Sequence, residues 1–109
     1  MALLKGTLDV IVLKTLSWGP MHAFEITKWL EDRSGGRLTV EDAALMQALH
    51  RLDESEILAG DWGITDNGRR ARYYRLTNVG RGHLRAETKR LTDYTDALVT
   101  ILATRSIEG

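Results

Sequence analysis

The 109-residue chain contains no cysteine, which excludes disulfide bonds and metal sites built from thiolates. No apolar run approaches the ~20 residues that a membrane-spanning helix requires. Asp9 and Lys14 interrupt the apolar start of the chain, and no cleavage motif of small residues follows, so we interpret this segment as a core helix and not as a signal peptide. These absences fit one small domain in the reducing cytoplasm.

Charge is strongly segregated along the sequence, although the formal net charge is zero. Residues 1–68 contain six basic and eleven acidic residues, a net of −5, whereas residues 69–90 contain eight basic residues and one acidic residue, a net of +7. A basic block of this kind indicates a local anion-binding surface, with a solvated helix face as the simpler alternative. Its densest part contains Arg69, Arg70, Arg72 and Arg75.

The spacing of apolar residues predicts four helices and one β-hairpin. Helices are expected at residues 7–17, 22–32 and 41–55 and from residue 78 onward, and strands at 57–62 and 71–77. Asn67-Gly68 between the two strands is a strong signal for a hairpin turn. Thr7 and Thr77 are expected to cap helices, and residues 39–42 resemble a capping box.

The last predicted helix carries apolar residues at the spacing of a coiled-coil seam, interrupted by Glu87. Since the earlier elements already form a compact unit, we expect this seam to pair with a second copy of the chain. The expected organisation is a unit of residues 1–77 followed by a dimerisation helix at 78–109. The expected dimer interface consists of Leu84, Leu91, Tyr94, Leu98 and Ile101.

Three helices followed by a hairpin is the order of a winged helix-turn-helix domain. The expected fold class is therefore mainly α (α+β), with a two-stranded wing and a long C-terminal dimerisation helix. In this fold the third helix enters the major groove of double-stranded DNA, and the wing contacts the phosphate backbone. The best-suited base reader is Gln47, because its amide can pair with the N6 and N7 atoms of adenine. The expected DNA-binding residues are Gln47, His50, Arg51, Arg69, Arg70 and Arg72.

Over nearly its whole length the sequence resembles the PadR-like family of bacterial transcriptional regulators. The resemblance rests on LKGTLD at residues 4–9, LKTL at 13–16, GPMH at 19–22, ALHRL at 48–52, ILAGDW at 57–62, RRARYYRLT at 69–77 and Gly80. It implies a homodimer that is joined mainly through the last helix and binds a palindromic operator. Such proteins usually act as repressors, and some are released from DNA by a small molecule.

The sequence departs from the family pattern at two places. Residues 43–47 read Ala-Ala-Leu-Met-Gln where the family has Gly-Ser-Leu-Tyr-Pro, so Ala44 and Met46 lack hydroxyl groups that could donate to DNA phosphates. Glu56 stands where the family usually has glycine, and a positive φ at this position would strain its backbone.

Other functions find less support in the sequence. An enzyme would need a catalytic base, a nucleophile or a phosphate-binding loop, and the sequence shows no such constellation. We therefore expect neither enzymatic activity nor a cofactor. His50 and Glu54 have the spacing of two metal ligands on a helix, but no third ligand accompanies them, and no metal site is expected. Four aromatic residues are either core residues or the wall of a pocket between subunits for a small aromatic effector: Trp18, Phe24, Trp29 and Trp62.

The main rival function is a winged-helix module that has lost specific DNA binding and contacts another protein. The basic wing favours DNA, whereas the acidity of the third helix favours the rival, because carboxylates repel phosphates unless they face away. The acidic residues are Glu41, Asp42, Asp53, Glu54 and Glu56, against Arg51 alone.

Overall fold

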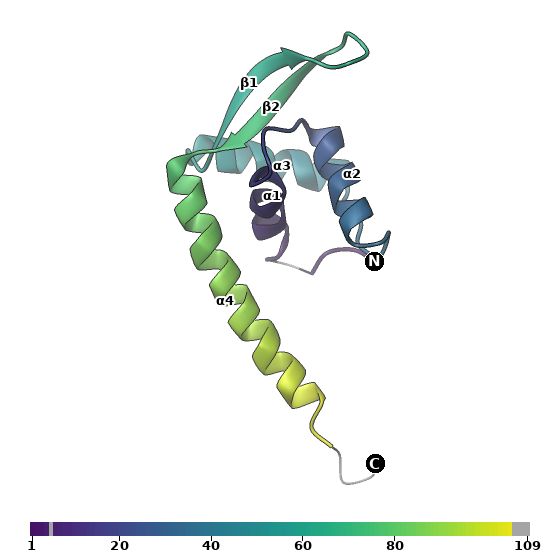
Figure 1. The fold of residues 1–109 in the computed structure, drawn as a ribbon, viewed down its shortest axis with the longest axis vertical. Helices are drawn as coiled ribbons and strands as arrows, with labels where there is room; N and C mark the ends of the chain where they lie inside the picture. The colour runs from purple at the N-terminus through teal and green to yellow at the C-terminus, as the bar shows by residue number, and fades with distance from the viewer. Residues whose placement is uncertain (5, 106–109) are drawn as a thin grey trace.

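The computed structural model describes residues 1–4 and 6–105, which form four helices and a two-stranded antiparallel sheet (Figure 1). The three N-terminal helices and the base of the hairpin form a compact body, from which the hairpin projects at one end and the last helix at the other. This is the winged helix-turn-helix architecture that the sequence predicts, with element bounds within two residues of expectation except at the end of the last helix. That helix was expected over 78–109 but ends at Leu102, and residues 106–109 lie outside the described residues. The elements are α1 (Leu8–Leu16), α2 (Ala23–Arg33), α3 (Asp42–Glu54), β1 (Leu58–Ile64), β2 (Arg70–Leu76) and α4 (Asn78–Leu102).

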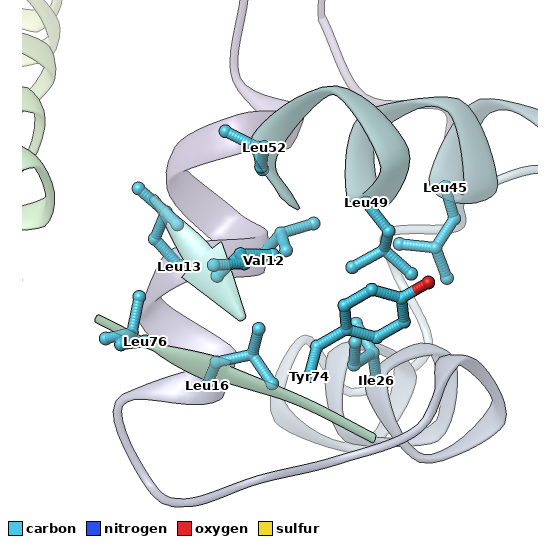
Figure 2. Packing of buried hydrophobic residues seen from close by; sticks show 10 residues of the cluster. Val12, Leu13, Leu16, Ile26, Leu45, Leu49, Leu52, Tyr74 and Leu76 are labelled. Carbon is cyan, nitrogen blue, oxygen red and sulfur yellow. The ribbon is translucent and has the colours of Figure 1, made fainter. Parts of the chain in front are cut away.

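The core lies where α1, α2 and α3 meet one face of the hairpin (Figure 2). The expected apolar stripe of α3 is buried, and β2 adds the aromatic ring of Tyr74, which lies beside Ile26 and Leu49. Each fully buried leucine stabilises the fold by roughly 1.5–3 kcal/mol, so these stripes hold the three helices together. The cluster comprises Val12, Leu13, Leu16, Ile26, Leu45, Leu49, Leu52, Leu58, Tyr74 and Leu76.

Two of the expected helix starts are wrong in detail. The Thr7 hydroxyl donates to the carbonyl of Leu4 at 2.6 Å and makes no capping bond to α1. The capping box at residues 39–42 does not form, because Thr39 is paired with the start of the chain: its N–H donates to the Met1 carbonyl at 2.9 Å. Glu41 therefore precedes α3 without a side-chain cap.

Two other helix starts are capped by side chains. Thr77 caps α4 as predicted, since its hydroxyl oxygen accepts from the N–H of Gly80 at 2.9 Å. At the start of α2, His22 Nδ1 accepts from the N–H of Glu25 at 3.3 Å, and the Glu25 carboxylate accepts from the N–H of His22 at 3.2 Å. This second arrangement is a reciprocal capping box formed by a histidine, a residue type outside the usual cap signals.

Strand β2 is hydrogen-bonded along both of its edges, which fixes the hairpin to the helical body. On one edge β1 pairs with it in the register Trp62 to Arg72, and on the other edge Met21 exchanges two backbone hydrogen bonds with Tyr74, at 3.1 and 2.9 Å. Gly68 has a φ of 80° in the turn, as the Asn-Gly signal predicts. Because side chains alternate along a strand, Arg72 shares a face with Trp62 and Tyr74.

Helix α4 leaves the compact body after its first turns (Figure 1). Leu84 packs against the core, whereas every residue from 92 to 102 is exposed in the single chain. None of the helices in the described part of the chain combines the length and the apolar character that crossing a bilayer demands.

Candidate nucleic-acid interface

The outward face of α3 is built mostly from small, apolar and polar side chains, and the exposed carboxylate of Glu54 lies on the same face at its C-terminal end. Ala43, Met46, Gln47 and His50 are all exposed on the side opposite the buried leucines, as helix periodicity predicts. These residues therefore form one continuous surface along α3. Their contact with DNA bases stays a prediction.

Arg51 lies on the flank of α3 that faces α1 and is not part of this outward face. Its two terminal nitrogens donate to the two carboxylate oxygens of Asp9, each at 2.7 Å. This paired hydrogen bond raises the pKa of Arg51. The carboxylate uses one N–H of each terminal nitrogen and offsets the charge of the guanidinium, so Arg51 is less suited to a phosphate than an unpaired arginine.

The three predicted wing arginines differ in their surroundings. Arg69 is exposed at the hairpin tip, and the Arg70 guanidinium lies over the ring of Trp62 at 4.3 Å. Arg72 is more buried: its terminal nitrogen lies 3.1 Å from the carboxylate of Asp53 in α3. Arg69 and Arg70 are thus the wing cations most available to an anion.

Arg72 instead ties the wing to α3. A Cβ atom at Gly60 would lie 2.6 Å from its Nε, so the glycine makes room for the guanidinium. The same ion pair neutralises Asp53, one of the carboxylates that would otherwise oppose DNA.

A hollow of about 540 Å³ lies between the wing and the start of α2. No carboxylate lines it, and the three wing arginines do, so its electrostatic character is positive. The hollow is bordered by His22, Ala23, Phe24, Thr65, Asn67, Arg69, Arg70, Ala71 and Arg72.

Phe24 is a surface residue that the sequence analysis did not place at this site. Its side chain is 72% exposed, and it borders both the cationic hollow and a second hollow of about 410 Å³ that extends to Met46 of α3. Helix periodicity could have indicated this exposure. Phe24 and Ile26 are two residues apart, about 200° around the helix, so they cannot both face the core. Phe24 therefore connects the wing side of the site to the α3 side.

The interpretation of the aromatic residues as core is wrong for three of them. Trp18 is 65% exposed and Trp62 is 58% exposed, in addition to Phe24. Within a single chain the four do not line a common pocket, because Trp18 and Trp29 flank Arg33 while Trp62 lies under the wing arginines. Among residues 1–4 and 6–105, no group of three or more histidines and carboxylates could hold a metal ion, so His50 and Glu54 gain no third ligand.

The predicted interface residues of α4 fall into two groups. Leu84 packs on the core of its own chain and Leu91 is half-buried, whereas three others are exposed and have no cover within the chain. The exposed residues are Tyr94, Leu98 and Ile101.

Comparison with known proteins identifies both a family and a fold. Residues 12–86 match the transcriptional regulator PadR-like family. A transcriptional regulator from Clostridium thermocellum superposes with a TM-score of 0.80 at 21% identity, covering 92% of this chain and 93% of that one. A PadR family transcriptional regulator from Eggerthella lenta has a TM-score of 0.77 at 27% identity, covering 93% and 86%. Bacillus subtilis PadR, solved in complex with operator DNA, has a TM-score of 0.67 at 18% identity, covering 74% of this chain and 46% of that one.

Proposed function

Because this chain belongs to the PadR-like family of transcriptional regulators, we propose that it is a homodimeric repressor that binds a palindromic operator through α3 and the wing. The family consists of DNA-binding transcription factors and not of enzymes. A repressor that binds DNA would act in the cytoplasm.

The observation that supports this proposal is the cationic hollow between the wing and α2. Three arginines line it without a carboxylate, beside a helix N-terminus whose dipole also attracts anions. A DNA phosphate fits this chemistry. The winged-helix relative from Bacillus subtilis was solved bound to operator DNA, which makes DNA the first partner to test.

We assign separate roles to the wing and to α3. Arg69 and Arg70 contact phosphates and position the domain without reading sequence. Gln47 reads adenine, and His50 contacts either a base or a phosphate. Met46 and Phe24 offer apolar contact, for example to a thymine methyl or a sugar. With so few hydrogen-bonding groups on this surface, we expect DNA shape to contribute to operator choice.

The proposed dimer pairs the exposed part of α4 with its copy, and the division into residues 1–77 and 78–109 follows from this assignment. A twofold dimer presents two α3 helices to successive major grooves. The two half-sites should then lie about one helical turn, roughly 34–36 Å, apart, or a multiple of it.

The decisive experiment is selection of binding sites from random DNA with the intact chain. We expect an inverted repeat, and binding that falls with salt at a slope of about −0.9 per neutralised phosphate. Recovery of no common sequence, together with a salt slope near zero, would contradict the proposal and favour the rival function: a winged-helix module that contacts protein and has lost specific DNA binding.

A further inference from the structure

The second hollow beside Phe24, about 410 Å³ in volume, lies between the first two turns of α2 and the first two turns of α3. Its floor is Leu45, which is 1% exposed and turned into the core (Figure 2). Its rims are two large apolar side chains, Phe24 from α2 and Met46 from α3, which are 72% and 38% exposed. This apolar hollow is lined by Ala23, Phe24, Thr27, Asp42, Leu45 and Met46.

The apolar hollow is unsuited to a phosphate, in contrast to the cationic hollow on the other side of Phe24. No lysine or arginine lines it, and its one charged residue is Asp42, whose carboxylate repels an anion. Apart from this carboxylate and the Thr27 hydroxyl, the side chains of the lining are apolar. The chemistry of the hollow therefore favours a neutral, apolar group as its occupant.

Met46 gives this hollow a character that departs from the family pattern. Methionine stands where the pattern has tyrosine, so a hydroxyl that could donate to a DNA phosphate is absent. The thioether chain of methionine is flexible and polarizable, and it adapts its shape to a neighbouring apolar group. A hydrogen-bond donor is thus replaced by apolar contact surface at the rim of the hollow.

The apolar hollow lies between two other parts of the proposed DNA interface. Phe24 borders it on one side and the cationic hollow on the other, and Met46 precedes Gln47 on the outward face of α3. The order along the surface is therefore cations, apolar side chains and an amide. A thymine presents the same order in the major groove: the phosphate of its strand, then the C5-methyl group, then the hydrogen-bonding edge of the base pair.

We propose that the apolar hollow receives the C5-methyl group of one thymine in each half-site of the operator, between the ring of Phe24 and the thioether of Met46. The proposal rests on the DNA-binding function proposed above and adds to it a base preference that no hydrogen bond supplies. Cytosine and uracil lack this methyl group, so the hollow distinguishes thymine from both. Contact with a deoxyribose, the other apolar part of DNA, would give no such distinction.

The methyl group can be removed from the DNA without any change to the protein. The operator selected with the intact chain is synthesised with one thymine at a time replaced by uracil, which lacks only that methyl group, and each affinity is measured by fluorescence anisotropy. We expect a loss of about fourfold at one thymine per half-site, the value for burial of one such carbon, and little change at the others. At the sensitive position 5-bromouracil should restore the affinity, because bromine is close to a methyl group in size.

Variants then identify the side chains that contact the methyl group. Phe24→Ala and Met46→Ala should each bind the thymine operator more weakly and distinguish thymine from uracil by less than about twofold. The matched control is Trp18→Ala, because Trp18 is 65% exposed but lies against Arg33 at the other end of α2. This control should retain the fourfold difference. Since Phe24 and Met46 are exposed, the melting temperatures of their variants should match that of the unmodified chain.

Two outcomes would overturn this inference and leave the proposed function standing. In the first, an operator is selected but no thymine in it is sensitive to uracil, so that no methyl group is read. In the second, a thymine is sensitive but both variants retain the full difference between thymine and uracil. Equal weakening on the two DNAs would then assign the hollow to a deoxyribose, and no weakening would place the methyl contact elsewhere on the protein. Failure to select any operator would contradict the proposed function and this inference together.

Discussion

Glu56 joins α3 to β1 with a backbone φ of 61°, the one non-glycine residue with positive φ in the described part of the chain. The neighbouring contacts hold it there: its carbonyl accepts from the Thr77 hydroxyl at 2.7 Å, and the next N–H, of Ile57, donates to Leu52 at 3.0 Å. A left-handed conformation costs an ordinary residue roughly 1–2 kcal/mol. The strain expected from the missing glycine is therefore present in the fold.

Glu56→Gly should raise the free energy of unfolding by up to about 1 kcal/mol, because relief of strain exceeds the added entropy of the unfolded glycine. Urea denaturation measures the change. Glu54→Gly, at the end of α3, is the matched control and should lower stability by about 0.5–1 kcal/mol. A loss of stability in both variants would show that the left-handed backbone is not strained by glutamate.

Gln47 is the residue on which base reading depends most. Gln47→Ala should weaken binding to the best operator by about 1–3 kcal/mol and relax the preference at one base pair per half-site. Since Gln47 is exposed, the free energy of unfolding should stay within about 0.5 kcal/mol of the unmodified chain. Selection of the same operator with the same stringency by the variant would show that Gln47 reads nothing.

The start of α4 is fitted closely against the segment that leads from α3 into β1. A Cβ atom at Gly80 would lie 2.1 Å from the carbonyl oxygen of Ile57, a backbone atom that cannot easily move. At Gly82, by contrast, the nearest atom belongs to the flexible side chain of Arg85, at 3.7 Å. Close packing against the backbone therefore requires a glycine at position 80, whereas the space around Gly82 would admit a side chain.

Gly80→Ala should lower the free energy of unfolding by about 1–3 kcal/mol, as overpacking does. Gly82→Ala should raise it by about 0.5–1 kcal/mol, since alanine is the better helix former. Thermal unfolding of the two single variants separates these effects. If both changes stabilise the protein, α4 does not pack closely on Ile57.

The arginines of the wing differ in their proposed roles: Arg69 and Arg70 contact phosphates, whereas Arg75 pairs with a carboxylate of its own chain. Arg69→Ala and Arg70→Ala should each weaken binding to all DNA sequences alike and reduce the salt slope by about one unit. Arg75→Ala is the control, because Arg75 lies away from the hairpin tip, on the opposite face of β2 from Arg70, and pairs with Asp61 at 3.6 Å. A change in the preferred base with Arg70→Ala would mean that the wing reads a groove.

At the scale of the whole molecule, α4 exposes apolar surface that the chain itself does not cover. Tyr94 is 63% exposed and Leu98 is 41% exposed, and all the other residues from 92 to 105 are exposed as well. Burial of each leucine in a dimer would stabilise it by roughly 1.5–3 kcal/mol.

We therefore expect a dimer by light scattering for the unmodified chain, and monomer for the double variant Leu91→Glu/Leu98→Glu. Thr100→Glu, on the opposite side of α4, should remain a dimer. Circular dichroism distinguishes a folded monomer from an unfolded chain. A monomeric unmodified chain would contradict the proposed assembly.

The order of elements, the buried stripes and the basic wing were all predictable, because they depend on local periodicity and turn chemistry. Leu45, Leu49 and Leu52 are buried as their spacing requires, and the family comparison agrees with the predicted fold. The family pattern marked Glu56 as a place where a positive φ would cause strain, and the structure has a φ of 61° there.

Only the tertiary structure decided which charges are paired and which aromatic residues are exposed. Arg51 meets Asp9 across 42 positions of sequence, and Arg72 meets Asp53 across 19. Such contacts depend on the angles at which helices and strands pack, and no local pattern encodes those angles. Sequence alone determined that three helices are followed by a basic hairpin; packing determined that Arg51 and Arg72 are paired with carboxylates, whereas Arg69 and Arg70 are exposed on the wing.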